Sequence, residues 1–299
     1  MTSIRSQRGQ ATVLTVLFIT VLLGMAALVL DAGSWFRAQR ETQAAADASA
    51  LAAAQALPES PGQANVLAAV YVGKNGGGAS TVTFSSRVVA NDTVKVRVER
   101  DAPGFFAKLF GIDSVQVGAG AAARAGGVSK ARYAAPIAVD EKHPLLQCKP
   151  LPCFGQDTEL DLEKTGPGAL RLLNLDGSKG GSGGAVTAGW ILKGFDGYMP
   201  LGWYGSDPGA AFNDSKVTSA MNVRIGDELL FPVYRSTKGG GSNFEYDVVG
   251  WVGFTVTGFS SHGNKGTVDG RFERVIWEGI LSESAAETDF GVRAIQLVE

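Results

Sequence analysis

The longest uncharged stretch of the chain covers residues 11–30 and reads ATVLTVLFITVLLGMAALVL. A helix rises about 1.5 Å per residue, so twenty residues extend roughly 30 Å, the thickness of the hydrocarbon core of a bilayer. Thr12, Thr15 and Thr20 can direct their hydroxyls to carbonyls of the same helix, so they are compatible with lipid. The stretch predicts a transmembrane helix over residues 11–30.

Two alternatives for this stretch stay open. The apolar region of a secretory signal peptide usually has roughly 7–15 residues and ends at a small-x-small cleavage site. Here the stretch is longer, and it ends in Leu28-Val29-Leu30-Asp31, which does not resemble such a site. The other alternative is a buried helix in the core of a globular domain.

The charges on either side of the stretch predict its orientation. Arg5 and Arg8 precede it without any acid in the first ten residues, whereas the charges that follow are mixed. Basic residues stay on the cytoplasmic side of a membrane. We therefore expect residues 1–10 to be cytoplasmic and everything after Asp31 to lie outside the cell membrane.

The helix is expected to continue beyond the membrane. Residues 31–57 contain no proline, residues 40–57 are rich in alanine, and Pro58 then prevents continuation. Steps of three and four residues select a seam of mostly small side chains. This seam either contacts the protein's own globular part or contacts identical or related helices in a fibre. Its members are Trp35, Ala38, Thr42, Ala45, Ser49, Ala52 and Ala56.

Residues 58–127 predict a small α/β sandwich. A short helix at 63–73 precedes strands at 81–89 and 93–100, and the second strand alternates valine with charged residues. A short helix with the sequence PGFFAKLF and a strand at 114–117 follow, and residues 125–130 are expected to be a linker.

Residues 128–299 predict a β-rich domain with two short helices, at 185–194 and 216–225. The fold class is therefore α+β: a long N-terminal helix, a small α/β sandwich and a β-rich C-terminal domain. The strands of this last domain are expected at 134–139, 170–175, 228–234, 246–259, 267–280 and 292–298.

Composition removes some classes of function. The formal net charge is −2 without a basic block, so nucleic-acid binding gains no support. Cys148 and Cys153 are the two cysteines, and outside the cytoplasm a disulfide between them is expected, with free thiols as the alternative. A metal site would need more ligands, and His143 and His262 are far apart in sequence. We expect no metal and no cofactor.

Three further patterns have a structural and a chemical interpretation. Gly180-Gly181-Ser182-Gly183-Gly184 matches a nucleophile elbow, and a tethered hydrolase would use Ser182 with His262. No strand leads into this segment and no helix pattern begins directly after it, so we expect a flexible loop. Asp157, Glu159, Asp161 and Glu163 alternate, which predicts a solvated strand face or, alternatively, calcium binding. An aromatic group predicts core packing or, alternatively, a glycan-binding or partner-binding surface; it consists of Trp190, Phe195, Tyr198, Trp203 and Tyr204.

Residues 8–57 resemble the N-terminal region of TadG-like proteins of the bacterial tight-adherence (Flp) pilus system. Residues 105–112 and 121–125 also resemble the domain that follows in such proteins. The motifs that carry the resemblance of residues 8–57 are Arg8-Gly9, Asp31-x-Gly33, Gln43-x-x-x-Asp47 and Leu51-Ala52-Ala53-Ala54.

The resemblance implies a non-enzymatic, membrane-anchored pilin-like component or assembly factor of such a pilus. Its implied partners are the lipid bilayer, other pilus-assembly or pilin proteins, and a prepilin peptidase that cuts after Gly9 and leaves Gln10 as the new terminus. Such substrates usually carry glutamate as the fifth residue of the mature chain, where this sequence has Leu14. A membrane-tethered adhesin or binding module is the alternative function.

Overall fold

The computed structural model describes residues 8–148, 152–162, 171–178, 181–207, 212–262, 265–284 and 289–298. The chain divides into two compact units. Unit 1 consists of Met1–Ser86, Asn91–Arg124 and Leu297–Glu299, and unit 2 consists of Arg87–Ala90 and Ala125–Gln296.

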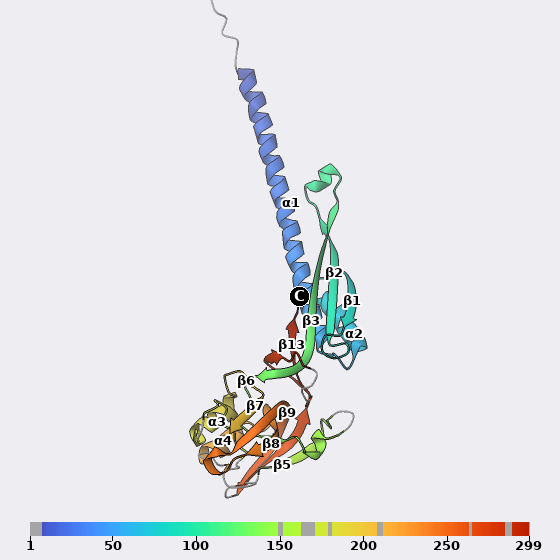
Figure 1. The fold of residues 1–299 in the computed structure, drawn as a ribbon. Helices are drawn as coiled ribbons and strands as arrows, with labels where there is room; N and C mark the ends of the chain where they lie inside the picture. Colours follow the sequence, from blue (N-terminus) through green and yellow to red (C-terminus); the bar gives the residue numbers. More distant parts are fainter. Residues whose placement is uncertain are drawn as a thin grey trace, which may run out of the picture. The chain divides into compact units, whose positions relative to one another are not determined.

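One helix dominates unit 1. Helix α1 spans Arg8–Ala54, 47 residues, as the uninterrupted apolar and alanine-rich pattern predicted (Figure 1). It ends shortly before Pro58, whose ring cannot continue a helix. The other elements of unit 1 are α2 (Pro61–Lys74), β1 (Ala79–Ser85), β2 (Thr93–Pro103), the 3₁₀ turn η1 (Ala107–Phe110) and the first part of β3 (Ser114–Ala131).

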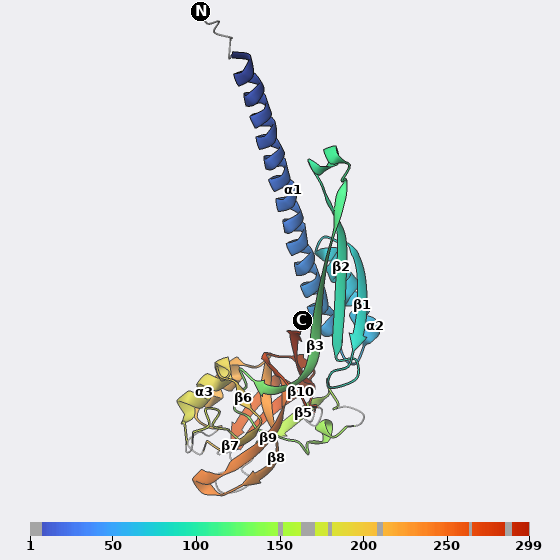
Figure 2. The same cartoon turned by 45° about the horizontal axis from the view of Figure 1, so that its top comes forward.

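Strands β1, β2 and β3 form an antiparallel sheet, and they lie side by side in both views (Figures 1 and 2). The register places Val94 opposite Ala123, Val96 opposite Ala121 and Val98 opposite Ala119. All six of these side chains are buried, whereas Lys95 and Arg97 on the other face of β2 are exposed. The alternation seen in the sequence therefore marks one apolar face of this sheet.

The second half of α1 packs against β2 and α2. The central members of the small-residue seam, Thr42, Ala45, Ser49 and Ala52, are buried. Their size lets the helix backbone approach closely, and the side-chain amides of Gln39 and Gln43 donate to the carbonyls of Gly118 and Gly120. Two interpretations of the seam were open, contact with the protein's own globular part and contact with other helices in a fibre. The structure shows the first of these contacts.

The linker predicted at residues 125–130 is wrong. These residues belong to β3, which is much longer than the predicted strand at 114–117. Alanine and glycine have weak strand preference, so the segment gives no local signal. Strand β2 pairs only with the part of β3 up to Arg124, and the end of β3 pairs with strands of unit 2. In unit 2, Val128 and Lys130 pair in turn with Leu281 and Ile280 of β12 (Gly279–Leu281).

Unit 2 is built on a six-stranded sheet in the order β4-β8-β9-β10-β5, with β7 paired to β9. The helices predicted at 185–194 and 216–225 are confirmed as α3 (Gly184–Lys193) and α4 (Ser215–Val223). The strands of the sheet are β4 (Val139–Asp140), β5 (Asp157–Asp161), β7 (Gly202–Gly205), β8 (Glu228–Lys238), β9 (Glu245–His262) and β10 (Lys265–Glu273). Smaller elements are η2 (Pro144–Leu146), β6 (Met199–Pro200), η3 (Gly241–Asn243), β11 (Val275–Ile276) and β13 (Val292–Leu297).

Strand β8 is buried on both faces, which explains its nearly continuous apolar run. Leu229, Phe231 and Val233 belong to one hydrophobic cluster, whereas Leu230 and Tyr234 belong to a second. Phe231 stacks on Phe254 of β9 with ring centroids 5.4 Å apart. The two clusters are the core of unit 2.

Several predicted strands of unit 2 are shorter or divided. Of the strand predicted at 134–139, the structure contains only the two-residue strand β4 at its end. The strand predicted at 170–175 is reduced to isolated bridges at Leu172 and Leu173, and Leu170 is outside the described residues. The strand predicted at 267–280 is divided into β10, β11 and β12. The three pieces pair with different strands: β10 with β9, β11 with β13, and β12 with β3.

Candidate functional site

The first half of α1 is an uncovered apolar surface. Its best 18-residue window has a mean hydropathy of 2.8, and none of that window is buried. Thr15 and Thr20 donate their hydroxyls to the carbonyls of Ala11 and Val16 over 2.8 and 2.9 Å, so these polar groups are satisfied within the helix. By length and composition this half of α1 can cross a membrane.

Asp31 directly follows the apolar stretch and binds a distant part of unit 1. Its Oδ1 accepts the backbone N–H of Phe105 over 2.8 Å, and its Oδ2 accepts those of Phe106 over 3.1 Å and of Ala107. The residue is only 3% exposed. We call this arrangement, Asp31 with the three N–H groups of residues 105–107, the Asp31 clasp.

The Asp31 clasp favours the ionised carboxylate. Burial alone would raise the pKa of Asp31, but the backbone hydrogen bonds from Phe105, Phe106 and Ala107 outweigh it and hold the pKa below the ordinary value of 3.8. A carboxylate can accept several N–H donors at once, so it suits the start of the 3₁₀ turn η1, where backbone donors lack partners. At neutral pH the clasp therefore contains a negative charge.

Sequence reasoning missed this role of Asp31. The residue was noted as a flanking charge and as part of the Asp31-x-Gly33 motif. The available signal was an acid placed directly at the end of an apolar span, together with a later turn, FFAKLF, whose backbone donors need acceptors.

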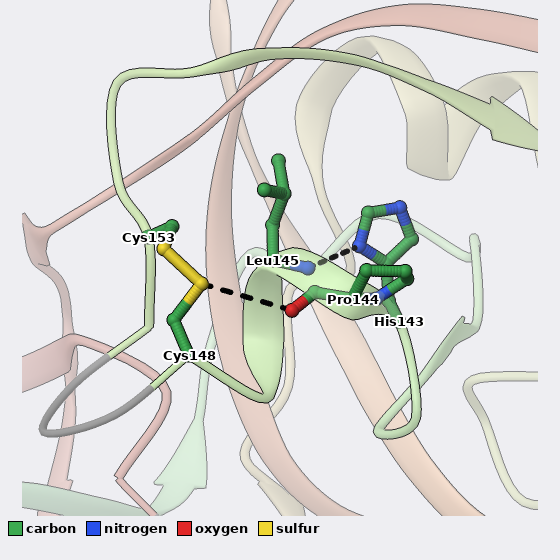
Figure 3. Close-up of a disulfide and its surroundings, with 5 residues drawn as sticks. All are labelled: His143, Pro144, Leu145, Cys148 and Cys153. Carbon is green, nitrogen blue, oxygen red and sulfur yellow. Dashed lines mark hydrogen bonds between the residues drawn. A yellow bond between two sulfur atoms is a disulfide. The ribbon is translucent and has the colours of Figure 1, made fainter.

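The two cysteines lie at the end of η2 in unit 2. Cys148 and Cys153 form a disulfide with their Cα atoms 5.6 Å apart (Figure 3). The Cys153 N–H donates to the Leu145 carbonyl over 2.7 Å, and the His143 ring Nδ1 accepts the Leu145 N–H over 3.3 Å. The disulfide thus closes a small loop that is also held by backbone hydrogen bonds.

Helix α3, predicted at 185–194, begins at Gly184, so the expectation that no helix pattern begins directly after the Ser182 segment is wrong. Two glycines form the start of this helix: Gly183 has a φ of +80°, and a Cβ on Gly184 would collide with the Asp214 carboxylate. The Ser182 hydroxyl donates to the side-chain oxygen of Asn174. Among the described hydrogen bonds none joins Ser182 to His262.

The alternating acids lie on β5, paired with β10. Asp157 lies 3.9 Å from Arg271 and is largely exposed, and Glu163 is outside the described residues. Within the described residues no group of three or more His, Cys, Asp or Glu side chains is placed to hold a metal ion.

A cavity of about 270 Å³ lies beside β5 in unit 2. Burial lowers the pKa of His143 in its wall, and the nearby charge of Arg171 adds to this effect. The wall mixes carboxylates with basic side chains and so has no single charge preference. Its ionisable residues are Asp140, Lys142, His143, Glu159, Asp161 and Arg171.

The aromatic group is divided between the core and the surface. Tyr204 is buried and donates its hydroxyl to the Pro200 carbonyl over 2.7 Å, and Trp190 meets Phe195 edge-on with centroids 5.8 Å apart. Trp203 is exposed and carries the Lys238 ammonium 3.9 Å from its ring centroid. Tyr198 is also exposed.

Comparison with known proteins gives one match. Residues 9–56 match the family model Tad, described as "Putative Flp pilus-assembly TadE/G-like". No curated protein and no solved structure matches the chain. The matched residues cover nearly all of α1 and the two residues after it, so the resemblance predicted for this segment is confirmed, and the match supports involvement in Flp pilus assembly.

Proposed function

We propose that the chain is a single-span, non-enzymatic component of a Flp pilus-assembly machinery, held in the cell membrane by the first half of α1. The observation that carries the proposal is the division of α1 at Asp31. Before this residue the helix is apolar and uncovered, and after it the helix is packed on the sheet of unit 1.

This division is what a pilin-like membrane protein requires. An uncovered apolar half can be solvated by lipid, and a covered half holds a globular body to it without a flexible connection. The basic residues Arg5 and Arg8 support a cytoplasmic N-terminus. In the proposed orientation, unit 2 and the part of unit 1 after Asp31 lie outside the cell membrane. A disulfide in unit 2 suits an oxidising compartment.

The proposal concerns an assembly component that remains in the membrane, and cleavage between Gly9 and Gln10 is not part of it. Leu14 stands where prepilin substrates usually carry glutamate. The seam that could have joined neighbouring helices in a fibre is already covered by unit 1. Both features favour an uncut chain that works beside the fibre, with other pilus components as its partners.

The test is deletion of the chain in the bacterium that carries it, followed by complementation. We expect pili to be lost on deletion and restored by the full chain, but not by a Leu17→Arg/Val21→Arg variant, which places two charges in the apolar stretch. The matched control is Arg37→Lys, an exposed position after the stretch, which should restore pili. Normal pili after deletion would contradict the proposal and favour a tethered adhesin.

A further inference from the structure

The turn between β2 and β3 carries an exposed group of large apolar side chains, which we call the apolar tip. Within residues 104–112, Lys108 is the single charged residue. Contiguous exposed apolar surface of this kind usually marks a contact with another body. The apolar tip consists of Phe105, Phe106, Leu109, Phe110 and Ile112, which are between 40% and 82% exposed.

The Asp31 clasp fixes the apolar tip at one level along α1. Asp31 holds the backbone of Phe105 and Phe106, and it is the first residue after the apolar stretch that ends at Leu30. Figure 1 shows the turn reaching along α1 toward the N-terminal half of the helix, and Figure 2 agrees. The tip therefore lies where a span over residues 11–30 would leave the hydrocarbon core.

The backbone of the turn is already satisfied within unit 1. Besides the three donors held by Asp31, the N–H of Gly104 donates to Asp113, that of Leu109 to Phe106, and that of Gly111 to Lys108. The Ile112 N–H donates to the Ala107 carbonyl over 3.1 Å. The main free-energy cost of moving a turn into a region of low polarity comes from backbone groups without hydrogen-bond partners. This cost is small here, because most backbone N–H groups of the turn have partners.

We propose that the apolar tip inserts into the outer interface of the lipid bilayer and forms a second membrane contact beside α1. This rests on the proposed membrane span. Aromatic side chains favour the interface, and an apolar face can enter roughly 5–10 Å into the boundary between headgroups and acyl chains. Lys108 can extend its ammonium to the lipid phosphates while its methylenes stay with the apolar tip.

Lipid is the occupant that the structure favours over a second protein copy. The apolar tip adjoins the end of the uncovered apolar half of α1 within the same unit, so one bilayer can solvate both surfaces. A single membrane helix leaves unit 1 free to rotate about the helix axis. A second membrane contact at the apolar tip restricts this rotation. Unit 1 would thus be held in one orientation on the membrane.

The experiment places an environment-sensitive label on the full chain in vesicles of phosphatidylcholine and phosphatidylglycerol. The three variants are Leu109→Cys in the apolar tip, Leu17→Cys in the span and Val66→Cys on the exposed side of α2. Figure 1 shows α2 at the end of the β1–β3 sheet opposite the turn. The native pair Cys148–Cys153 is oxidised and does not take up the label.

Quenching by lipids brominated on their acyl chains and by aqueous iodide gives the answer. We expect brominated lipid to quench the labels at residues 17 and 109, and iodide to quench the label at residue 66. If iodide quenches the label at residue 109 while brominated lipid quenches the label at residue 17, the apolar tip is not inserted. The proposed membrane span of α1 would then still stand. If neither quencher reaches the label at residue 109, another protein surface covers the apolar tip, and this result also overturns the proposed insertion into lipid. No bromine quenching at residue 17 would reject the span itself.

Discussion

The backbone N–H of Phe105 donates to the side-chain carboxylate of Asp31 over 2.8 Å, across 74 residues of sequence. Two neighbouring N–H groups, of Phe106 and Ala107, donate to the same carboxylate. This contact joins the point where the apolar stretch of α1 ends to the turn between β2 and β3. It therefore couples the turn that carries the apolar tip to helix α1.

Asp31→Asn is expected to loosen the turn. One acceptor oxygen becomes an amide that points hydrogens at backbone donors, and the charge that strengthens the remaining hydrogen bonds is lost. Hydrogen exchange at the amides of Phe105, Phe106 and Ala107 should become about tenfold faster or more. Glu41→Gln is the matched control, because Glu41 pairs with Arg37 on the exposed side of α1, away from the clasp. Equal protection in the two variants would show that the clasp does not hold the turn.

Acid should release the same contact. The pKa of Asp31 is lower in the folded protein than its ordinary value of 3.8, so the clasp contributes stability that is complete above that value. This contribution is lost as the pH falls through the lower, folded pKa. The carboxyl carbon signal of Asp31 followed by NMR should titrate with a midpoint below 3.8. A midpoint above 3.8 would mean that burial outweighs the hydrogen bonds.

The small-residue seam should tolerate enlargement poorly. Ala45 is a fully buried member of the seam in the second half of α1, so Ala45→Leu is expected to destabilise unit 1 by about 1–3 kcal/mol through overpacking. Ala44 is exposed on the same helix, and Ala44→Leu is expected to leave the stability nearly unchanged. Thermal unfolding of both variants in detergent measures the difference. Equal destabilisation would place the contact face of α1 elsewhere.

The disulfide is expected to make a modest contribution. Cys148 and Cys153 are five residues apart, and closing so short a loop restricts the unfolded chain by about 2 kcal/mol. The Cys148→Ser/Cys153→Ser variant should lose this amount in denaturant unfolding of unit 2. Protein isolated from membranes should also show no reactive thiol before reduction. Two free thiols in that sample would contradict both the bridge and an oxidising location.

Sequence patterns were sufficient where a local rule decides the structure. The uncharged stretch and the alanine-rich segment predicted α1, and the alternation of Val94, Val96 and Val98 predicted β2. In each case the pattern of apolar and polar side chains along the sequence matches that expected for the helix or the strand. The burial of Thr42 and Ser49 then follows from the small seam, although its partner could not be read from the sequence.

The failures have a common physical cause, which is that the partner is distant in sequence. Residues 118–124 become a strand because β2 pairs with them, not because alanine and glycine prefer one. The Asp31 clasp joins a side chain to backbone donors far along the chain, and the sequence signals at its two ends do not show that the two segments meet. Helix α3 was predicted, but its start directly after the Ser182 segment was not, because that start depends on the close approach of Gly184 to Asp214.

The central claim is that the first half of α1 holds the chain in a membrane. Alkaline carbonate extraction of membranes from cells that produce the full chain tests it most directly. We expect the full-length chain to stay in the membrane pellet, because twenty uncharged residues of α1 are solvated by lipid. Release of the intact chain into the carbonate supernatant would contradict membrane anchoring by α1.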